Sequence, residues 1–369
     1  MHRIATKPGD LDLEHKLLEV NQTPAEILFI STADTELSGI AKVWGPRFKG
    51  KLRLMQANLL IHPKSAEYYA DHVLCKAKLA IFRLHGGYGY FPHLLDEIKH
   101  IKSHGAKTLM LVLPGTDDWD QELLTFNDFS ESVVLQVFAY FREGGLENLE
   151  RSADAIELLL SNKTSTLPQA IKVPTFGWQN CDFSKVKNLT KNGGKISSDG
   201  TTLKQFQKNS GRVWLTYYRA LQQTGDMQVV EALIKSLKNH GLNVSSFYAY
   251  SLREPEAQEE MLRKKEEEPP DVILTMQSFS IGRMDERVSF LETLNCPVIQ
   301  VCNSTENIDA WRKNPRGLSP SNVAMSVALP ETDGRIFSTV VGFKHERSVD
   351  SDLEFGPKYL VPEKLQVSH

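Results

Sequence analysis

The stretch KLAIFRLHGGYGYFPHLLDEIKHIKSHGAKTLMLVL (78–113) decides the fold class of this chain. Its two ends, KLAIFRL (78–84) and KTLMLVL (107–113), are apolar runs of strand length. An amphipathic helical pattern from about Pro92 to His104 separates them. Parallel strands need a long crossover connection, and a helix usually supplies it. The stretch therefore predicts part of a parallel sheet that is covered by helices.

The same alternation fills the first 161 residues. Two further apolar runs predict strands, EILFIST (26–32) and KLRLMQAN (51–58). Helical patterns begin at about Asp34 and in HPKSAEYYADHVLCK (62–76), where Pro63 stands near the start. Two more helical patterns follow, ESVVLQVFAYFREGG (131–145) and LENLERSADAIELLL (146–160), with a break at Gly144 and Gly145. We therefore predict an N-terminal α/β domain over 1–161.

The alternation restarts after a polar, turn-rich segment, 162–210, which we predict to be an irregular linker. The predicted strands are RVWLTYY (212–218), LNVSSFYAY (242–250), DVILTMQ (271–277) and CPVIQVC (296–302). The predicted helices are MQVVEALIKSLKNHG (227–241), EPEAQEEMLRKKEEE (254–268) and DERVSFLETLN (285–295). A second α/β domain over 211–345 and a C-terminal tail over 346–369 follow. The predicted fold class is α/β, with two successive parallel sheets flanked by helices in flavodoxin-like or Rossmann-like layering.

Composition excludes several classes of protein. The 369 residues include 41% hydrophobic and 24% charged residues, which is typical of globular proteins. Lys and Arg number 43 and Asp and Glu 46, so the net charge is −3, and without a basic stripe no nucleic-acid partner is predicted. No apolar run approaches the roughly 18 residues that a membrane span needs. We expect a cytoplasmic protein without a membrane span.

Motifs for cofactor and metal binding are weak. NGGK (192–195) lacks the upstream Gly and the following Ser or Thr of a phosphate-binding loop, so the sequence gives no sign that the chain binds ATP. No CxxC spacing occurs among the four cysteines. His100 and His104 stand four residues apart on the helix 92–104, a spacing that can bind a divalent metal but that is much more often found on a solvated helix face. We assign no metal site and predict no tightly bound cofactor.

Two loops are candidates for substrate binding, because ligands of open α/β sheets lie beyond the carboxyl ends of the strands. HGGYGY (85–90) follows one predicted strand and offers His85 and Tyr88. YRALQQTGD (218–226) follows another and offers Tyr218 and Arg219, a phenol and a guanidinium suited to stacking and to pairing with a carboxylate. Tight turns and a salt bridge at the strand end are the alternatives.

The segment RGLSPSNVAMSVALPETDGRI (316–336) raises a separate question. We predict a helix from Ser319 to Leu329 that packs Val323, Val327 and Leu329 inward, and a strand RIFSTVVGF (335–343) after the break at Pro330. Glu331 and Asp333 are either a catalytic acid pair or structural partners of Arg335. We favour the structural role, since no nucleophile or base stands nearby, and the catalytic residues are unknown.

The same segment resembles the family of large chelatase subunits that contains CobN of cobaltochelatase and the H subunit of magnesium chelatase. Further segments resemble the family in the same order: QTPAEILFISTADTEL (22–37), ANLLIHPKSAEYYADHVL (57–74), AKLAIFRLHGGYGYFP (77–92), LMLVLPGTDDWDQEL (109–123), YFREGGLEN (140–148) and YYRALQQTGDMQVVEALIKSL (217–237). The similarity covers most of the chain outside 162–210. The HGGYGY and YFREGG segments are more similar to the cobalt branch.

The resemblance implies a tetrapyrrole-binding subunit that works with separate AAA+-type ATPase subunits, which use the ATP. In the cobalt branch, Co²⁺ is the substrate metal, and it is inserted into the corrinoid hydrogenobyrinic acid a,c-diamide in cobalamin biosynthesis. The alternatives are a magnesium chelatase H-type fragment that acts on protoporphyrin IX, and a non-catalytic tetrapyrrole-binding or subunit-docking module. The family's large subunits are several times longer, so we expect this chain to be an N-terminal portion that lacks the metal-insertion residues.

Overall fold

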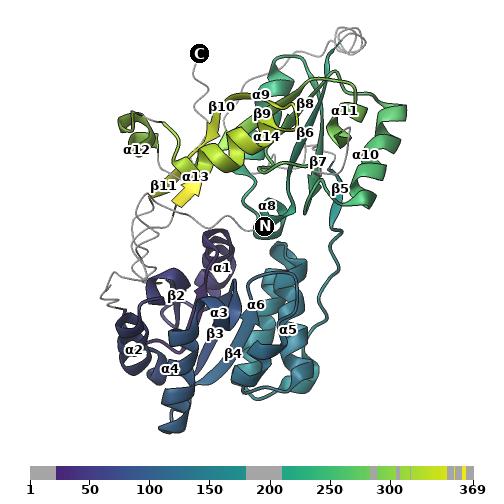
Figure 1. The fold of residues 1–369 in the computed structure, drawn as a ribbon. Coiled ribbons are helices and arrows are strands. Elements are labelled where there is room, and N and C mark those ends of the chain that lie inside the picture. The colour runs from purple at the N-terminus through teal and green to yellow at the C-terminus, as the bar shows by residue number, and fades with distance from the viewer. Residues whose placement is uncertain are drawn as a thin grey trace, which may run out of the picture.

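The computed structural model describes residues 22–179, 210–282, 289–304, 308–315, 317–346, 353 and 360–362. Two helix-covered sheets form two halves, with the N-terminal half in the lower part of Figure 1 and the second half above it. No helix within these residues is both long and apolar enough to cross a membrane.

The first sheet has four strands in the order β2-β1-β3-β4, and all of its pairs are parallel. Its strands are β1 (Ile27–Ser31), β2 (Leu52–Gln56), β3 (Leu79–Leu84) and β4 (Leu109–Pro114). Every residue of β1 and β3 is buried, which explains why both read as continuous apolar runs instead of alternating ones.

Helices cover both faces of this sheet. On one face lies a core that includes Phe29, Trp44 and Phe141, under α1 (Asp34–Arg47), α5 (Glu131–Glu143) and α6 (Leu146–Leu160). The other face carries α2 (Pro63–His72) and α4 (Pro92–Ser103). The short elements are α3 (Gly87–Tyr90) and the 3₁₀ turns η2 (Ala57–Leu60), η3 (Leu74–Lys76), η4 (Gln121–Phe126) and η5 (Thr164–Thr166).

The second sheet has six strands in the order β10-β9-β8-β6-β7-β5. Its strands are β5 (Phe176–Gln179), β6 (Arg212–Tyr218), β7 (Asn243–Ala249), β8 (Val272–Thr275), β9 (Val298–Asn303) and β10 (Ile336–Gly342). Only the edge strand β5 pairs antiparallel among these six. A separate antiparallel pair joins β11 (Lys344–Glu346) and β12 (Leu360–Pro362).

The helices of the second half lie on both faces of the sheet (Figure 1). They are α8 (Arg219–Thr224), α9 (Gln228–Asn239), α10 (Pro255–Glu267), α11 (Phe290–Thr293), α12 (Ile308–Lys313), α13 (Pro320–Val323), the π-helical turn η7 (Ala324–Ala328) and α14 (Leu329–Glu331). The first part of the helix predicted over 285–295 lies outside the described residues.

The predicted fold class is confirmed. In both sheets the first parallel strand, β1 or β6, lies between the second and the third, and the fourth lies outside the third. With β9 and β10 added, the second sheet has the strand order of flavodoxin-like folds.

Three features differ from the sequence prediction. The segment predicted to be irregular contains β5, four residues that are too short to show a strand period. Leu353, from the predicted C-terminal tail, is 4% exposed and lies in the core of the first half. The two candidate loops are in part short helices, α3 and α8. The proposed domain boundaries stay a prediction.

The helix α8 joins the second half to the break between α5 and α6. Gln223 donates from Nε2 to the carbonyl oxygen of Arg142 at 2.7 Å, and its own carbonyl accepts from the amide of Gly145 at 2.6 Å. Gly144 has φ +68°, and a Cβ at this position would lie 2.4 Å from Cβ of Gln223. The double glycine therefore permits both the turn and the close approach of α8.

We expect Gly144→Ala to lower the free energy of unfolding by about 2 kcal/mol or more, because it adds an overlap with Gln223 to the cost of a positive φ. Gly145→Ala is the matched control, since φ there is +85° but nothing lies within 4 Å of its Cβ position. Urea unfolding of the two variants measures the difference. Equal losses would show that the approach of α8 is not tight at Gly144.

Candidate functional site

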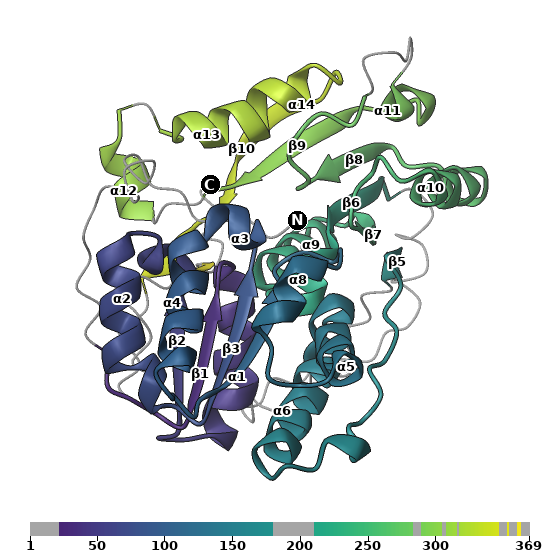
Figure 2. The same cartoon turned by 60° about the horizontal axis from the view of Figure 1, so that its bottom comes forward.

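The carboxyl ends of both parallel sheets lie at the boundary between the two halves. Figure 2 shows α3 and α8, which directly follow β3 and β6, on the sides of the halves that face each other. Across this boundary Arg219, just after β6, lies 3.5 Å from Asp117, just after β4. Ligands of open α/β sheets bind where the strand order reverses, here between β1 and β3 and between β6 and β8.

A pocket of about 240 Å³ opens at the reversal point of the second sheet. Its walls come from the carboxyl ends of β6, β7 and β8 and from α14. Large side chains of the lining are Tyr218, Tyr250, Arg253, Phe279 and Leu329. Aromatic and apolar side chains with a few polar groups are the usual lining of a small-molecule site.

Gln277 ties the strand ends under this pocket together. The side chain is 2% exposed and donates from Nε2 to the carbonyl oxygens of Tyr217 and Ala249, at the ends of β6 and β7. Its Oε1 accepts from the amide of Leu252 at 3.2 Å. Because one amide side chain satisfies three backbone groups, the floor of the pocket is held before any ligand binds.

The loop 277–282 forms one wall, and an ion pair between Asp333 and Arg335, which stand between α14 and β10, holds it. Asp333 accepts hydrogen bonds from the Ser280 hydroxyl at 2.6 Å and from the amides of Ile281 and Gly282 at 2.6 and 2.9 Å. Arg335 lies 2.6 Å from Asp333. It donates to the carbonyl oxygens of Gln277 and Phe279. The pair therefore binds both the amides and the carbonyls of this wall.

The predicted structural role of Asp333 agrees with this geometry. Burial alone would raise its pKa, but the hydrogen bonds from Ser280, Ile281, Gly282 and Arg335 lower the pKa below its ordinary value. Burial also lowers the pKa of Arg335, against the effect of Asp333. Glu331 is exposed, so the two acids do not form a catalytic pair in this structure.

The helix predicted from Ser319 to Leu329 is present over 320–331, but Pro330 does not end it, because α14 continues through Pro330 to Glu331. The predicted inward packing of Val323 and Leu329 is also wrong. Val323 and Leu329 are each 40% exposed, while Asn322 and Ser326 are 2% and 1% exposed. The polar side faces inward because the loop beneath needs hydrogen-bond partners. The Ser326 hydroxyl lies 3.0 Å from that of Ser278, and the carbonyl of Met325 accepts from the amide of Phe279 at 2.7 Å.

Phe279 carries backbone strain at the pocket. Its φ is +66°, a left-handed conformation that a bulky residue rarely adopts. Arg335 and Met325 hold its carbonyl and amide, respectively. Such conformations persist only where surrounding contacts fix them, and they cluster at binding and catalytic sites.

His85 lies at the carboxyl end of the first sheet, just after β3. The His85 amide donates to the Thr32 hydroxyl at 3.2 Å, across the reversal point between β1 and β3. Behind it, the buried ion pair of Arg83 and Glu36 measures 2.8 Å, and Ser31 donates to the same Glu36. Burial lowers the pKa of His85, so its imidazole is neutral at neutral pH. A neutral imidazole can accept a proton or bind a ligand.

The other predicted residues occupy different places. Tyr88 lies in α3, at the carboxyl end of the first sheet. Its hydroxyl donates to Asp96 at 3.0 Å, and its ring lies beneath Lys99. Tyr218 lines the pocket and donates to the carbonyl of Ser278 at 3.0 Å. The structure thus places the four predicted residues in three surroundings. His85 and Tyr88 lie at the carboxyl end of the first sheet, Tyr218 lies in the pocket of the second sheet, and Arg219 lies between the two halves.

Arg219 is 3% exposed between the halves. Its guanidinium donates to four carbonyl oxygens at 3.0–3.2 Å, those of Arg142, Glu143, Val173 and Pro174. Burial raises the pKa of Asp117, and Arg219 opposes that shift. These partners leave Arg219 no face for a substrate carboxylate in this structure, so the alternative of a salt bridge at the strand end describes it better.

Sequence reasoning missed Gln277, Tyr250 and Arg253. No motif marks them, because three separate strands must come together before these residues are neighbours. The one available signal was position, since Tyr250 and Gln277 end predicted strands and Arg253 follows one.

The histidine pair on α4 gains no support as a metal site. His100 and His104 have ring centroids 4.3 Å apart, but His104 Nδ1 lies 2.9 Å from the carbonyl oxygen of His100. Within the part of the chain that the structure describes, no three His, Cys, Asp or Glu side chains gather to hold a metal ion.

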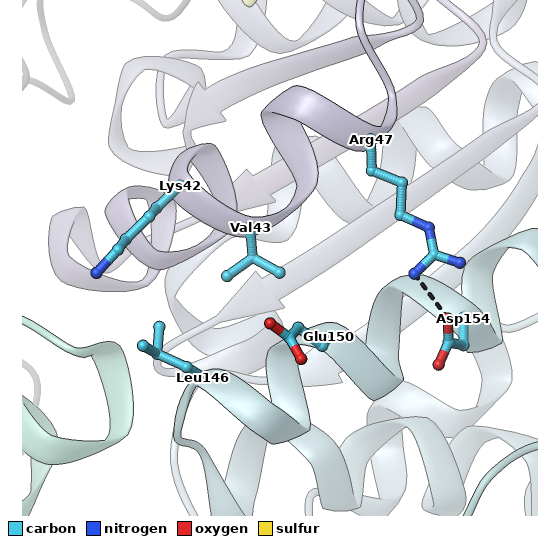
Figure 3. A pocket seen from close by; sticks show the side chains of 6 residues that line it. All are labelled: Lys42, Val43, Arg47, Leu146, Glu150 and Asp154. Atoms are coloured by element: carbon cyan, nitrogen blue, oxygen red, sulfur yellow. Dashed lines mark ion pairs between the residues drawn. The ribbon is translucent and has the colours of Figure 1, made fainter. Parts of the chain in front are cut away.

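A further hollow of about 480 Å³ lies between α1 and α6. Figure 3 shows Val43 and Leu146 on its two sides and Arg47 paired with Asp154 at one end. Arg47 also pairs with Glu157 at 2.7 Å, so its charge is already matched by protein carboxylates. The pocket beside Tyr218 is the better candidate, since it lies at a reversal point and is lined by aromatic rings.

The fold and pocket define a class, a two-sheet α/β protein with a pocket at the carboxyl ends of the parallel strands of its second sheet. The chain belongs to the CobN/Magnesium Chelatase family, whose sequence profile matches residues 138–368, more than half of the chain. This confirms the family resemblance of the sequence motifs.

Individual relatives agree. The aerobic cobaltochelatase subunit CobN of a Sinorhizobium species is 31% identical over 361 residues, which cover 96% of this chain and 28% of that protein. The CobN subunit of Pseudomonas aeruginosa is 28% identical, covering 93% and 27%. The H subunit of magnesium chelatase from Rhodobacter capsulatus is 28% identical over 160 residues, covering 42% and 13%.

A solved structure shows the same fold. The catalytic subunit of cobaltochelatase from Mycobacterium tuberculosis superimposes with a TM-score of 0.59 at 23% identity, covering 90% of this chain and 26% of that one. The chain therefore spans little more than a quarter of the two CobN subunits and of this structure.

Proposed function

We propose that this chain is a tetrapyrrole-binding part of the large subunit of an ATP-dependent cobaltochelatase. The observation that carries the proposal is the match to two CobN subunits over 96% and 93% of the chain, against 42% for the magnesium chelatase relative. On this proposal the substrate is hydrogenobyrinic acid a,c-diamide, and Co²⁺ is the metal that the complete enzyme inserts. AAA+-type ATPase subunits are the proposed partners.

The described residues suit binding better than metal insertion. Insertion needs bases that take two protons from the pyrrole nitrogens and ligands that deliver the metal. Among the described residues that line the pocket, none is a carboxylate, a histidine or a cysteine. We therefore assign substrate binding to this part, with Tyr218 in the pocket and His85 and Tyr88 at the carboxyl end of the first sheet as proposed contacts.

Titration of the purified chain with hydrogenobyrinic acid a,c-diamide tests the proposal. We expect saturable quenching of tryptophan and tyrosine fluorescence at micromolar concentrations, and weaker binding of protoporphyrin IX. The absence of quenching by either ligand would contradict a tetrapyrrole-binding role.

A magnesium chelatase H-type function is the second candidate, and the match to the Rhodobacter capsulatus relative favours it. The same titration separates the two candidates, because that function requires tighter binding of protoporphyrin IX than of the corrinoid acid.

A further inference from the structure

The pocket at the carboxyl ends of β6, β7 and β8 has an apolar, aromatic lining and one charged side chain. Tyr218, Tyr250, Phe279 and Leu329 supply flat or apolar surface, and Arg253 supplies the cation. Asp117 and Glu254 influence the pKa of Tyr250, but neither lines the pocket. A ligand that suits this lining has a flat apolar body and an anionic edge.

Arg253 is exposed and makes no ion pair with any residue that the structure describes. The other arginine of this region, Arg335, is 2% exposed, and its two terminal nitrogens are already hydrogen-bonded to Asp333, to Gln300 and to carbonyl oxygens of the loop 277–282. The guanidinium of Arg335 therefore holds the wall of the pocket, while that of Arg253 remains available at the rim to bind a ligand. A guanidinium binds a carboxylate through two parallel hydrogen bonds, which gives both affinity and orientation.

The size of the pocket limits what it encloses. Its volume of about 240 Å³ is below the roughly 300–1,000 Å³ of sites that enclose a drug-sized ligand. Its rim is apolar, however, because Tyr250 is 37% exposed and Leu329 is 40% exposed. A larger planar ligand can place one edge in the pocket and rest its face on this rim.

We propose that this pocket binds one carboxylate-bearing edge of a tetrapyrrole, with Arg253 pairing with the peripheral carboxylate and Leu329 contacting the ring. The inference rests on the proposed function and adds the subsite and the recognised group. The pocket is preorganised for binding. Gln277 fixes its floor, and the Asp333–Arg335 pair fixes the strained loop at Phe279.

The test compares hydrogenobyrinic acid a,c-diamide with its methyl-esterified form, in which the peripheral carboxylates are blocked. We expect Arg253→Gln to weaken binding of the acid by about tenfold to a hundredfold, as for loss of a hydrogen bond to a charged group, and to leave binding of the ester unchanged. Leu329→Ala weakens both forms by about tenfold, since it removes apolar contact without adding a charge.

Arg263→Gln is the matched control, because Arg263 is a 57% exposed arginine on α10 that does not line the pocket. It leaves both affinities unchanged. Equal affinity of wild type and Arg253→Gln for the acid would overturn the pocket assignment while the proposed function stands. Failure of the wild type to bind either form would overturn the proposed function, and the pocket assignment with it.

Discussion

Asp333→Asn lowers the free energy of unfolding by about 3–5 kcal/mol, the expected cost of removing one partner from a buried ion pair. The side chains of Asp333 and Arg335 are 2% and 0% exposed, so solvent cannot replace the lost charge. Asparagine keeps the shape of the side chain but leaves the guanidinium of Arg335 buried without a counter-charge. It also replaces one of the two oxygens that accept from the loop 277–282.

Glu331→Gln is the control for this variant. Glu331 stands two residues earlier in the same motif and is exposed, so we expect its free energy of unfolding to match that of wild type. Guanidinium unfolding followed by circular dichroism measures both. If Asp333→Asn were as stable as Glu331→Gln, the ion pair would not be what holds the loop.

The pH dependence gives an independent check. The folded-state pKa of Asp333 is lowered, so its carboxylate stabilises the fold at pH values above the unfolded-state pKa of about 3.9. That contribution is lost as the pH falls through the lower folded-state pKa. The stability difference between wild type and Asp333→Asn is therefore full at neutral pH and shrinks in acid.

Much of the fold was predictable, because local sequence and strand order agree. The run KLAIFRL becomes β3 within one residue, since each of its strand residues is buried between two helical layers. The four-residue strand β5 was not predictable in this way, because an edge strand forms through its partner β7 and not through its own pattern.

The candidate site was predictable only in part. Tyr218 ends the strand β6, and it lines the pocket at the carboxyl ends of the strands, where the rule for open α/β sheets directs attention. Arg219, the next residue, enters α8 and turns into the boundary between the halves. Adjacent residues with equally suitable chemistry thus have different surroundings, and the difference arises from packing between segments that are distant in sequence.

The inward polar side of the segment 320–331 shows the same limit. An apolar pattern with Val323 and Leu329 predicts a buried apolar stripe. The structure buries Asn322 and Ser326 instead, because the strained loop beneath offers an amide and a hydroxyl that need partners. A demand for hydrogen bonds by a distant loop cannot be seen in the segment's own sequence.

Replacing Arg219 by methionine tests whether the halves are joined as the structure shows. Methionine has a similar reach but cannot donate, so four carbonyl oxygens lose their donor, and Asp117 and Glu143 lose a nearby cation. We expect the free energy of unfolding to fall by about 3–5 kcal/mol. The pKa of Asp117, which Arg219 holds down against burial, should rise further.

Arg263→Met is the control variant. It also removes a paired arginine charge, but from an exposed side chain instead of a buried one. Arg263 has two ion-pair partners, Glu260 and Glu267, but its side chain is 57% exposed and both pairs lie on one helix. Exposed pairs of this kind contribute about 0.2–1 kcal/mol, so Arg263→Met should stay close to wild type. Calorimetric unfolding of both variants decides the matter. If Arg219→Met unfolded at the same temperature as Arg263→Met, the buried guanidinium would not hold the halves together. If Arg219→Met unfolds at a much lower temperature than Arg263→Met, the carboxyl ends of the two sheets are fixed to each other before a ligand binds.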